Sequence, residues 1–447
     1  MAWLQEALEA LVDLGPRGGL DRFAASLDPA WIEEALRSTG TTSIRRRKLP
    51  AEQVVWLVLG MALYADRPIQ AVLSHLGLVE SGDGKVAASA VVQARYRLGP
   101  DPIRWLFERV AAAWGDTPDL DGYRGLALFG LDGTHLRVPD SDENFEYFGK
   151  PGGRAGSSDA GYPQLRMVAL MNLSNRLLKA VRTGPFSLSE QDLARTLWAE
   201  VPNNSITLFD RGFLSYMNLL ELVADGENRH VVMRLRADTT YEEFEELSDG
   251  SVLAMVHPPE YLRREDPDLP GPVEVRVIAY QHPGGQPSRI ATTLVDPEKY
   301  PSSELVRLYH ERWELELAFD ELKTHMLERN EALRSKKPDG VEQELWGLLL
   351  VYTLVRREML LTAQASKVPA SRMSFRASLL WIRDFWTTGW MLSPGTVPRK
   401  LSDLRELLIK ELVLPPRRTE RRYPRHVKIK MSNYPRNRGK RGLEVAK

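Results

Sequence analysis

Residues able to do chemistry are most concentrated in the stretch YHERWELELAFDELK, residues 309–323. On an ideal helix turning ~100° per residue, Tyr309, Arg312, Glu316 and Lys323 fall within an arc of about 60°. A carboxylate beside two cations and a phenol suits a site where a metal ion meets a phosphodiester, with Glu316 as the metal ligand. A solvated charged face is the alternative. Because Asp320 lies on the same arc, geometry alone does not fix the choice of carboxylate.

Two aspartates follow apolar runs that predict buried strands. Asp132 comes directly after residues 126–131, and Asp210 comes directly after residues 206–209. In an open α/β sheet, ligands gather beyond the carboxyl ends of the strands, because loops there can hold side chains that the packed sheet cannot. Each aspartate is therefore a candidate active-site residue. A turn-forming or helix-capping role is the alternative for either one.

Together these residues resemble the DDE transposases of the insertion sequence 4 (IS-4) family. The likeness rests on LDGTHLRVPD around Asp132, LFDRGF around Asp210 and the Tyr-x2-Arg-x3-Glu-x6-Lys signature of residues 309–323, and it spans about residues 120–365. It implies an RNase H-like fold and a DNA transposase. Such an enzyme binds the ends of an insertion sequence, cleaves them by a route that can include a hairpin, and joins the 3′-hydroxyls to target DNA.

The implied chemistry depends on three carboxylates, those of Asp132, Asp210 and Glu316, as catalytic residues and metal ligands. Two divalent ions about 3.5–4 Å apart can hold a scissile phosphate, one activating the attacking oxygen and the other stabilising the leaving oxygen. The expected ions are Mg²⁺, with Mn²⁺ as a substitute, and Asp132 is expected to bridge them. The residues expected to grip the end phosphates are Tyr309, Arg312 and Lys323.

Two neighbours of the signature residues are further candidate DNA contacts. Arg211 directly follows Asp210. Trp313 follows Arg312 and is the nearest candidate platform for stacking a base, with a core position as the alternative. Some members of the resembled family hold a flipped base with a tryptophan from an insertion before the glutamate. Residues 211–312 contain no tryptophan, which is a departure from that pattern.

The hydrophobic pattern of the central region predicts the strand and helix order of an RNase H-like core. After the strand that precedes Asp132, the expected elements are strands at about 164–173 and 177–183, a helix near 189–200 capped by Ser189, the strand before Asp210, and a helix at 215–224. A glycine-rich stretch at 149–158 lacks the ending of a phosphate-binding P-loop. Alternating apolar runs between Pro- and Gly-rich turns predict a β-rich insertion at about 230–295.

The first hundred-odd residues carry helical patterns that predict a separate bundle, with helices at about 3–12, 30–38, 51–64 and 68–77. In the segment that follows, Ser89, Gln93 and Arg97 share one helical face. Small and polar residues on such a face are typical of a recognition helix in a major groove, and an ordinary bundle helix is the alternative. Helices are also expected at about 340–365, 373–388 and 399–412.

The expected fold class is therefore α/β, with an RNase H-like core, a β-rich insertion and helical regions at both ends. The expected domains are a helical DNA-binding domain at 1–120, the catalytic core at 121–335, a helical region at 336–414 and a basic tail at 415–447. The tail holds twelve basic and two acidic residues, although the whole chain balances 60 of each. Such a tail would gain affinity for DNA through counterion release, and a merely solubilising tail is the alternative.

Composition narrows the remaining classes. The chain of 447 residues has no cysteine, which excludes disulfides and thiolate metal sites. No run approaches the ~18 apolar residues of a membrane span, and the acidic start lacks the basic region of a secretory signal. We expect a cytoplasmic, nucleoid-associated bacterial protein with double-stranded DNA as its partner, no membrane, and a homodimer on DNA. The alternatives are an RNase H-like host nuclease without strand transfer and a catalytically silent DNA-binding descendant.

Overall fold

The computed structural model describes residues 27–43, 49–78, 86–115, 122–151, 161–224, 226–281, 286–327, 332–388 and 397–412. Three features expected from the sequence lie outside these residues. They are the helix at about 3–12, most of the glycine-rich stretch at 149–158, and the basic tail at 415–447.

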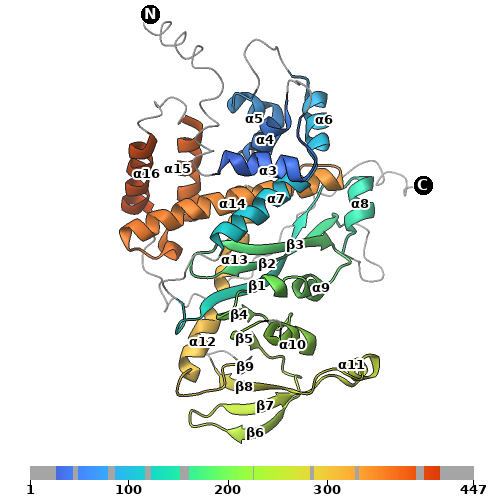
Figure 1. The fold of residues 1–447 in the computed structure, drawn as a ribbon, viewed down its shortest axis with the longest axis vertical. Helices are drawn as coiled ribbons and strands as arrows, with labels where there is room; N and C mark the ends of the chain where they lie inside the picture. The colour runs from blue at the N-terminus through green and yellow to red at the C-terminus, as the bar shows by residue number, and fades with distance from the viewer. Residues whose placement is uncertain are drawn as a thin grey trace, which may run out of the picture. The chain divides into compact units, whose positions relative to one another are not determined.

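A nine-stranded sheet organises the described chain, in the order β3-β2-β1-β4-β5-β9-β8-β7-β6 (Figure 1). β1 is antiparallel to β2, and β2 to β3, whereas β4 and β5 continue the sheet in parallel with β1. The strands are β1 Ala127–Arg137, β2 Gln164–Asn172, β3 Leu178–Pro185, β4 Ser205–Phe209, β5 Arg229–Arg234, β6 Glu242–Glu246, β7 Val252–Val256, β8 Val273–Tyr280 and β9 Ser288–Thr292. The first five strands form an α/β core, of which the sequence predicted the first four.

Alternation along the strands gives the sheet two buried faces. In β1, Leu128 and Leu136 belong to one apolar cluster, and Phe129 and Leu131 belong to the other. The first cluster includes residues of α7 (Asp101–Trp114) and α14 (Pro338–Ser366). The second includes residues of α9 (Glu190–Arg195) and α10 (Tyr216–Ala224). Helices therefore cover both faces, as an α/β core requires.

Two expected boundaries in the core are wrong. β1 does not end before Asp132 but continues to Arg137, because its pairing with β2 persists to that residue. The parallel pairing with β4 does end at Leu131, opposite Phe209. Asp132 is therefore the first β1 residue beyond the parallel ladder, and Asp210 follows the last residue of β4. The helix expected near 189–200 is split into α9, capped by the Ser189 hydroxyl, and the 3-10 turn Trp198–Glu200.

The strands after α10 extend the same sheet. β5 was expected to open the β-rich insertion, but it pairs in parallel with β4 and so completes the α/β core. β9, β8, β7 and β6 then follow as antiparallel neighbours. The short helix α11 (Glu260–Glu265) lies between β7 and β8. We call β6–β9 with α11 the antiparallel extension.

The remaining helices surround α14, whose side chains are buried over most of its length. They are α3 Pro29–Ser38, α4 Ala51–Leu63, α5 Ile69–His75, α6 Ala88–Leu98, α8 Asp142–Phe148, the turn Ala370–Arg372, α15 Phe375–Thr388 and α16 Val397–Leu412. α4 and α6 pack on α14 and share its apolar cluster, so they do not form the separate bundle that the sequence suggested. Among the described residues, no helix is long and apolar enough to cross a membrane.

Candidate active site

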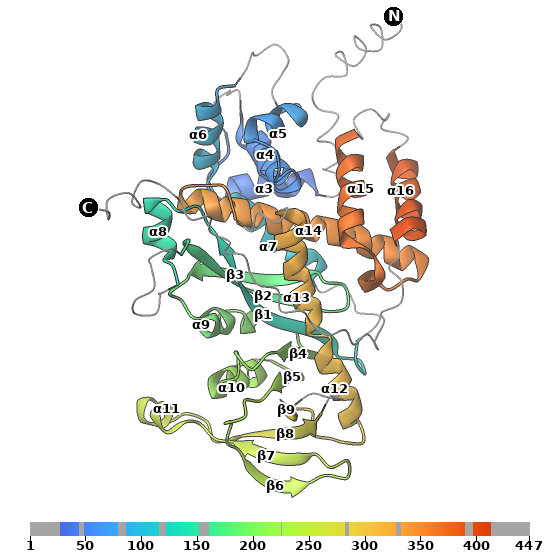
Figure 2. The same cartoon turned by 180° about the vertical axis from the view of Figure 1, so that it is seen from behind.

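The signature segment is not the single regular helix that the spacing predicted. Two residues separate α12 (Ser302–His310) from α13 (Trp313–Asp320) (Figure 2), and Glu321–Met326 continues as a π-helix. At the junction, the N–H groups of Glu311 and Arg312 donate to carbonyls three residues back. The backbone is tight there and wide in the π segment, so an ideal 100° projection does not describe where Lys323 points.

α13 packs closely on β1 because β1 carries a glycine at the contact. A Cβ on Gly130 would lie 2.5 Å from Leu315 of α13 and 2.7 Å from Leu173. Only a residue without a side chain fits that spacing. The close approach places the next residue of the helix, Glu316, beside the β1 residues that follow Gly130.

Arg312 joins two of the three predicted carboxylates. Its Nη1 lies 3.1 Å from Oδ2 of Asp132, and its Nη2 lies 2.6 Å from Oε1 of Glu316. The Arg312 and Asp132 side chains are mostly buried, whereas that of Glu316 is 38% exposed. Strand β1 and helix α13 therefore deliver their acids to the same guanidinium.

The charge of Asp210 also raises the pKa of Asp132. Burial raises the pKa of Asp132 to about 6; Arg312 and the Gly133 N–H oppose this rise, and the charges of Asp210 and Glu316 add to it. Asp210 lies at the end of β4, where its Oδ1 accepts a hydrogen bond from the Gly212 N–H at 2.6 Å. One oxygen of Asp210 thus stabilises the turn, which is the turn-forming role given above as the alternative for this residue. All three acids nevertheless share one electrostatic neighbourhood.

Glu316 and Asp320, which share one helical face in the sequence analysis, have different partners in the structure. Asp320 is exposed and accepts a hydrogen bond from the Thr324 hydroxyl at 2.6 Å. Glu316 instead shares Arg312 with Asp132. The choice of Glu316, which the spacing left open, is the one that the packing favours.

Lys323 and Tyr309, the other two residues of the signature, also lie near these carboxylates. Nζ of Lys323 lies 2.5 Å from Oγ1 of Thr134, two residues beyond Asp132 on β1. Burial raises the pKa of Tyr309 to about 12, against the effect of Arg312 and with that of Tyr280 and Asp210. The phenol therefore stays protonated and lies within electrostatic reach of Asp210.

Comparisons with known proteins identify the family of this chain. Residues 125–354 match the family described as "Transposase DDE domain", and residues 17–108 match "Insertion element 4 transposase N-terminal". The chain is 36% identical over 421 residues to "Transposase InsG for insertion sequence element IS4" of Escherichia coli K12, covering 94% of each protein. The chain belongs to the IS4 family of DDE transposases. It is therefore a DNA transposase of an insertion sequence.

Two further likenesses were found. This transposase is 36% identical over 292 residues to "Putative transposase InsZ" of E. coli K12, covering 64% of this chain and 92% of the relative. A cryo-EM structure of the piggyBac transposase synaptic complex with hairpin DNA is a distant likeness. Its TM-score is 0.44 with 12% identity, over 89% of this chain and 86% of that one.

The residues present fit a divalent cation, although Arg312 now lies between two of them. Carboxylate oxygens are the donors that Mg²⁺ prefers, and the raised pKa of Asp132 marks negative charge that its surroundings do not fully compensate. Within the described residues, no three acidic or histidine side chains are arranged as a finished metal site. His135 lies nearby but accepts a hydrogen bond from Arg166 Nε at 3.1 Å.

A buried cluster of charged residues next to α13 of this IS4-family transposase was not predicted from the sequence. Arg176, in the β2–β3 turn, donates to Glu314 at 2.5 Å and to Glu321 at 2.7 Å. Glu321 also pairs with Arg356 of α14 and accepts from the Tyr352 hydroxyl. The cluster fixes α13 and the π segment between the β2–β3 turn and α14. One feature of the sequence could have indicated this cluster, because Glu314 and Glu321 lie among the apolar residues of segment 309–323.

The remaining predicted DNA contacts are all at the surface. Trp313 is 56% exposed, so the core position that was its alternative is wrong. Arg211 is exposed beside Asp210. Ser89, Gln93 and Arg97 are exposed on α6, which lies on the other side of α14 from the sheet (Figure 1). The structure therefore does not bring these three to the carboxylates.

Proposed function

We propose that this transposase cuts the ends of its element and joins the resulting 3′-hydroxyls to target DNA at Asp132, Asp210 and Glu316. The observation that carries the proposal is the Arg312 guanidinium, which draws acids from β1 and α13 together beside Asp210. Acids from separate elements rarely share a buried site without a cationic ligand.

Those three carboxylates would hold Mg²⁺, or Mn²⁺ in its place. When bound, the ions would supply Lewis acid stabilisation of the attacking and leaving oxygens. The side chain of Asp132 is less exposed than that of Glu316, and Asp132 lies within electrostatic reach of both other acids, so we place it at the centre of the ligand set. Asp210 and Glu316 complete the set from β4 and α13.

The cationic residues of the signature would hold the DNA. Arg312 presents a planar fork suited to a phosphate, and it can exchange its carboxylate partners for phosphate oxygens as the acids take up cations. Lys323 is positioned by Thr134 at the same face. Tyr309 stays protonated and can donate its O–H to a phosphate oxygen.

Two substitutions at phosphorus account for the reaction. Water first attacks the phosphate at the element's end and breaks the bond to the 3′-oxygen, which leaves as a 3′-hydroxyl. That hydroxyl then attacks a target phosphate and releases a target 3′-hydroxyl, so each bond formed replaces one broken. A hairpin arises if the first 3′-hydroxyl attacks the opposite strand. We infer that a homodimer on DNA holds the two ends.

A strand-transfer assay tests the proposal. The substrate is a duplex carrying the inverted repeats that flank the gene, labelled at the transferred strand and mixed with plasmid and Mg²⁺. We expect label joined covalently to the plasmid. Cleaved ends without joined product would instead identify a nuclease, and binding without cleavage would identify a catalytically silent descendant.

A further inference from the structure

An arginine-lined cleft adjoins the candidate active site on the side of the antiparallel extension. Its volume is about 600 Å³, within the range of roughly 300–1,000 Å³ typical of ligand pockets. The cleft is lined by Leu235, Tyr280, a few small or polar residues and four arginines. The four arginines are Arg211, Arg234, Arg236 and Arg289. We call this feature the arginine cleft.

Strand register explains why the cleft lies beside Asp210. Phe209, the last residue of β4, pairs with Met233 of β5, so Arg234 lies next to the position from which Asp210 emerges. On its other side Arg234 pairs with Ile290 of β9, one residue beyond Arg289. The cleft therefore opens at the carboxyl end of β5, one strand away from a predicted metal ligand.

Three of these arginines donate side-chain hydrogen bonds to neutral partners. Arg234 donates to the Ser288 hydroxyl, and Arg236 donates to the Arg211 carbonyl. Arg289 donates to the Tyr241 hydroxyl and to two backbone carbonyls. Among the described side chains, no acid forms an ion pair with any of the four.

Other arginines of the same chain show the contrast. Arg176, Arg276 and Arg356, which are buried for structural purposes, each pair with an acid. Four like charges around one cleft repel each other, and folding alone gives no reason to gather them. An anion in the cleft removes that repulsion, and guanidinium forks match phosphate oxygens in pairs.

We propose that the arginine cleft binds the phosphate backbone of the DNA strand that adjoins the cleaved phosphodiester. This inference rests on the proposed function, because it takes DNA at Asp210 as the starting point. Arg234 and Arg236 are exposed and hold the strand's phosphates, Arg211 links them to the active site, and Leu235 and Tyr280 form an apolar wall against the sugar. The chemistry recognised is the phosphodiester, from either an unpaired or a paired strand.

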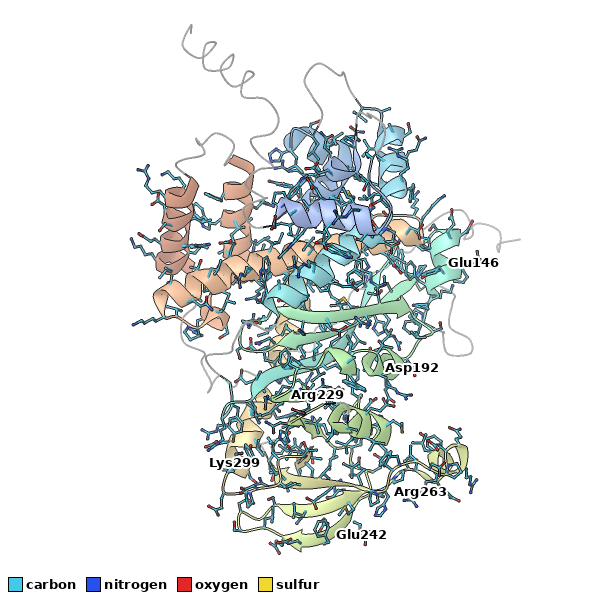
Figure 3. All side chains as sticks on the ribbon, in the orientation of Figure 1. Glu146, Asp192, Arg229, Glu242, Arg263 and Lys299 are labelled. Carbon is cyan, nitrogen blue, oxygen red and sulfur yellow. The ribbon has the colours of Figure 1, made fainter. Side chains whose placement is uncertain are left out.

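The test compares two pairs of substitutions that remove equal charge. The cleft variant is Arg234→Gln with Arg236→Gln. The control variant is Lys299→Gln with Arg307→Gln, both exposed and located in sequence after the far end of β9; Figure 3 shows Lys299 on the left of the sheet, across from Asp192 and Arg263. The full chain is titrated with labelled oligothymidine and with a labelled random duplex, over a range of salt concentrations, and binding is followed by fluorescence anisotropy.

We expect the cleft variant to lower the slope of log K against log salt by about 1.4 to 1.8, since each of the two lost phosphate contacts contributes about 0.7 to 0.9. Its affinity at 0.15 M salt should fall roughly 10- to 30-fold on the same basis. A larger loss with oligothymidine identifies an unpaired strand, and a larger loss with the duplex identifies a paired one. Equal losses in the cleft and control variants would overturn the proposal.

Two further measurements keep the result unambiguous. Arg234→Lys with Arg236→Lys should restore the slope if the cleft variant has lost charge and not its fold. Cleavage of an end-containing duplex by the unaltered protein is measured in parallel. Loss of slope without any cleavage would leave the cleft standing and remove the proposed function, whereas cleavage with an unchanged slope would do the reverse.

Discussion

Nη1 of Arg312 lies 3.1 Å from Oδ2 of Asp132, so a guanidinium from the start of α13 neutralises an acid in the middle of β1. The same side chain holds Glu316 through its other terminal nitrogen. The Arg312 guanidinium therefore occupies the position between Asp132 and Glu316 at which a metal ion is expected. We therefore expect Arg312 to compete with a metal ion for these acids before DNA binds, and its release to a phosphate would free both acids.

Replacing Arg312 tests that competition. In Arg312→Gln, Mn²⁺ binding without DNA should tighten about tenfold, because one cation beside two acids is worth on the order of 1.4 kcal/mol or more at a partly exposed site. Titration calorimetry measures the affinity. Arg211→Gln, which removes a neighbouring charge with no ion pair to these acids, serves as the control. Equal affinity in Arg312→Gln and the unaltered protein would refute the competition.

Trp313 offers a test of DNA contact that is separable from stability. Its exposed ring contributes little to the core, so Trp313→Ala should leave the unfolding midpoint unchanged. If a base stacks on the ring, DNA affinity should fall by about 1–3 kcal/mol. Quenching of tryptophan fluorescence by bound DNA should shrink in parallel. Unchanged affinity would exclude a stacking role.

The buried cluster behind α13 predicts a large loss of stability. Glu321→Gln leaves Arg356 buried and without its charged partner, so the free energy of unfolding should fall by about 3–5 kcal/mol. Denaturant unfolding followed by circular dichroism gives the value. Glu298→Gln, at an exposed position, should change it by about 0.5 kcal/mol or less. A similar small change for Glu321→Gln would mean that the cluster does not hold the segment.

A second ion pair predicts a pH dependence in the antiparallel extension. Asp249 pairs with Arg276, which is fully buried. Burial alone would raise the pKa of Asp249, but hydrogen bonds from Ser251 and Ser302 hold it well below its usual range. With a depressed folded pKa, its stabilisation is fully present above the unfolded pKa of about 3.9 and is lost as the pH falls toward the folded value.

The corresponding measurement is unfolding of Asp249→Asn between pH 3 and pH 7. The variant should be about 3–5 kcal/mol less stable than the unaltered protein at neutral pH, because Arg276 loses its partner. The difference should stay constant down to about pH 5 and shrink below about pH 4. A difference that grows toward acid pH would have the wrong sign for this assignment.

The periodic parts of the chain were predictable from sequence, because alternation and apolar runs report burial directly. The order of β1, β2, β3 and β4 and the Ser189 cap follow from such patterns. The continuation of β1 beyond Asp132 did not, since it depends on pairing with β2 and not on local hydrophobicity. The parallel pairing of β5 with β4 was missed for the same reason.

The site was predictable in its residue types but not in its contacts. Helical spacing alone did not separate Glu316 from Asp320. The family signature names Glu316, and in the structure Glu316 contacts Arg312 whereas Asp320 contacts Thr324. The π segment that positions Lys323 has no simple signature in the sequence. Arg176 was unpredictable too, because its partners lie 138 and 145 residues away along the chain.

Single-turnover cleavage of an end-containing duplex in Mg²⁺ shows whether the three carboxylates carry out the reaction. The three informative variants are Asp132→Asn, Asp210→Asn and Glu316→Gln, and Asp320→Asn is the matched control on the same helix. We predict a loss of about 10³-fold or more in each of the three, with DNA affinity retained, and a nearly normal rate in the control. Cleavage that survives in any of the three, or that is lost equally in Asp320→Asn, would contradict this prediction.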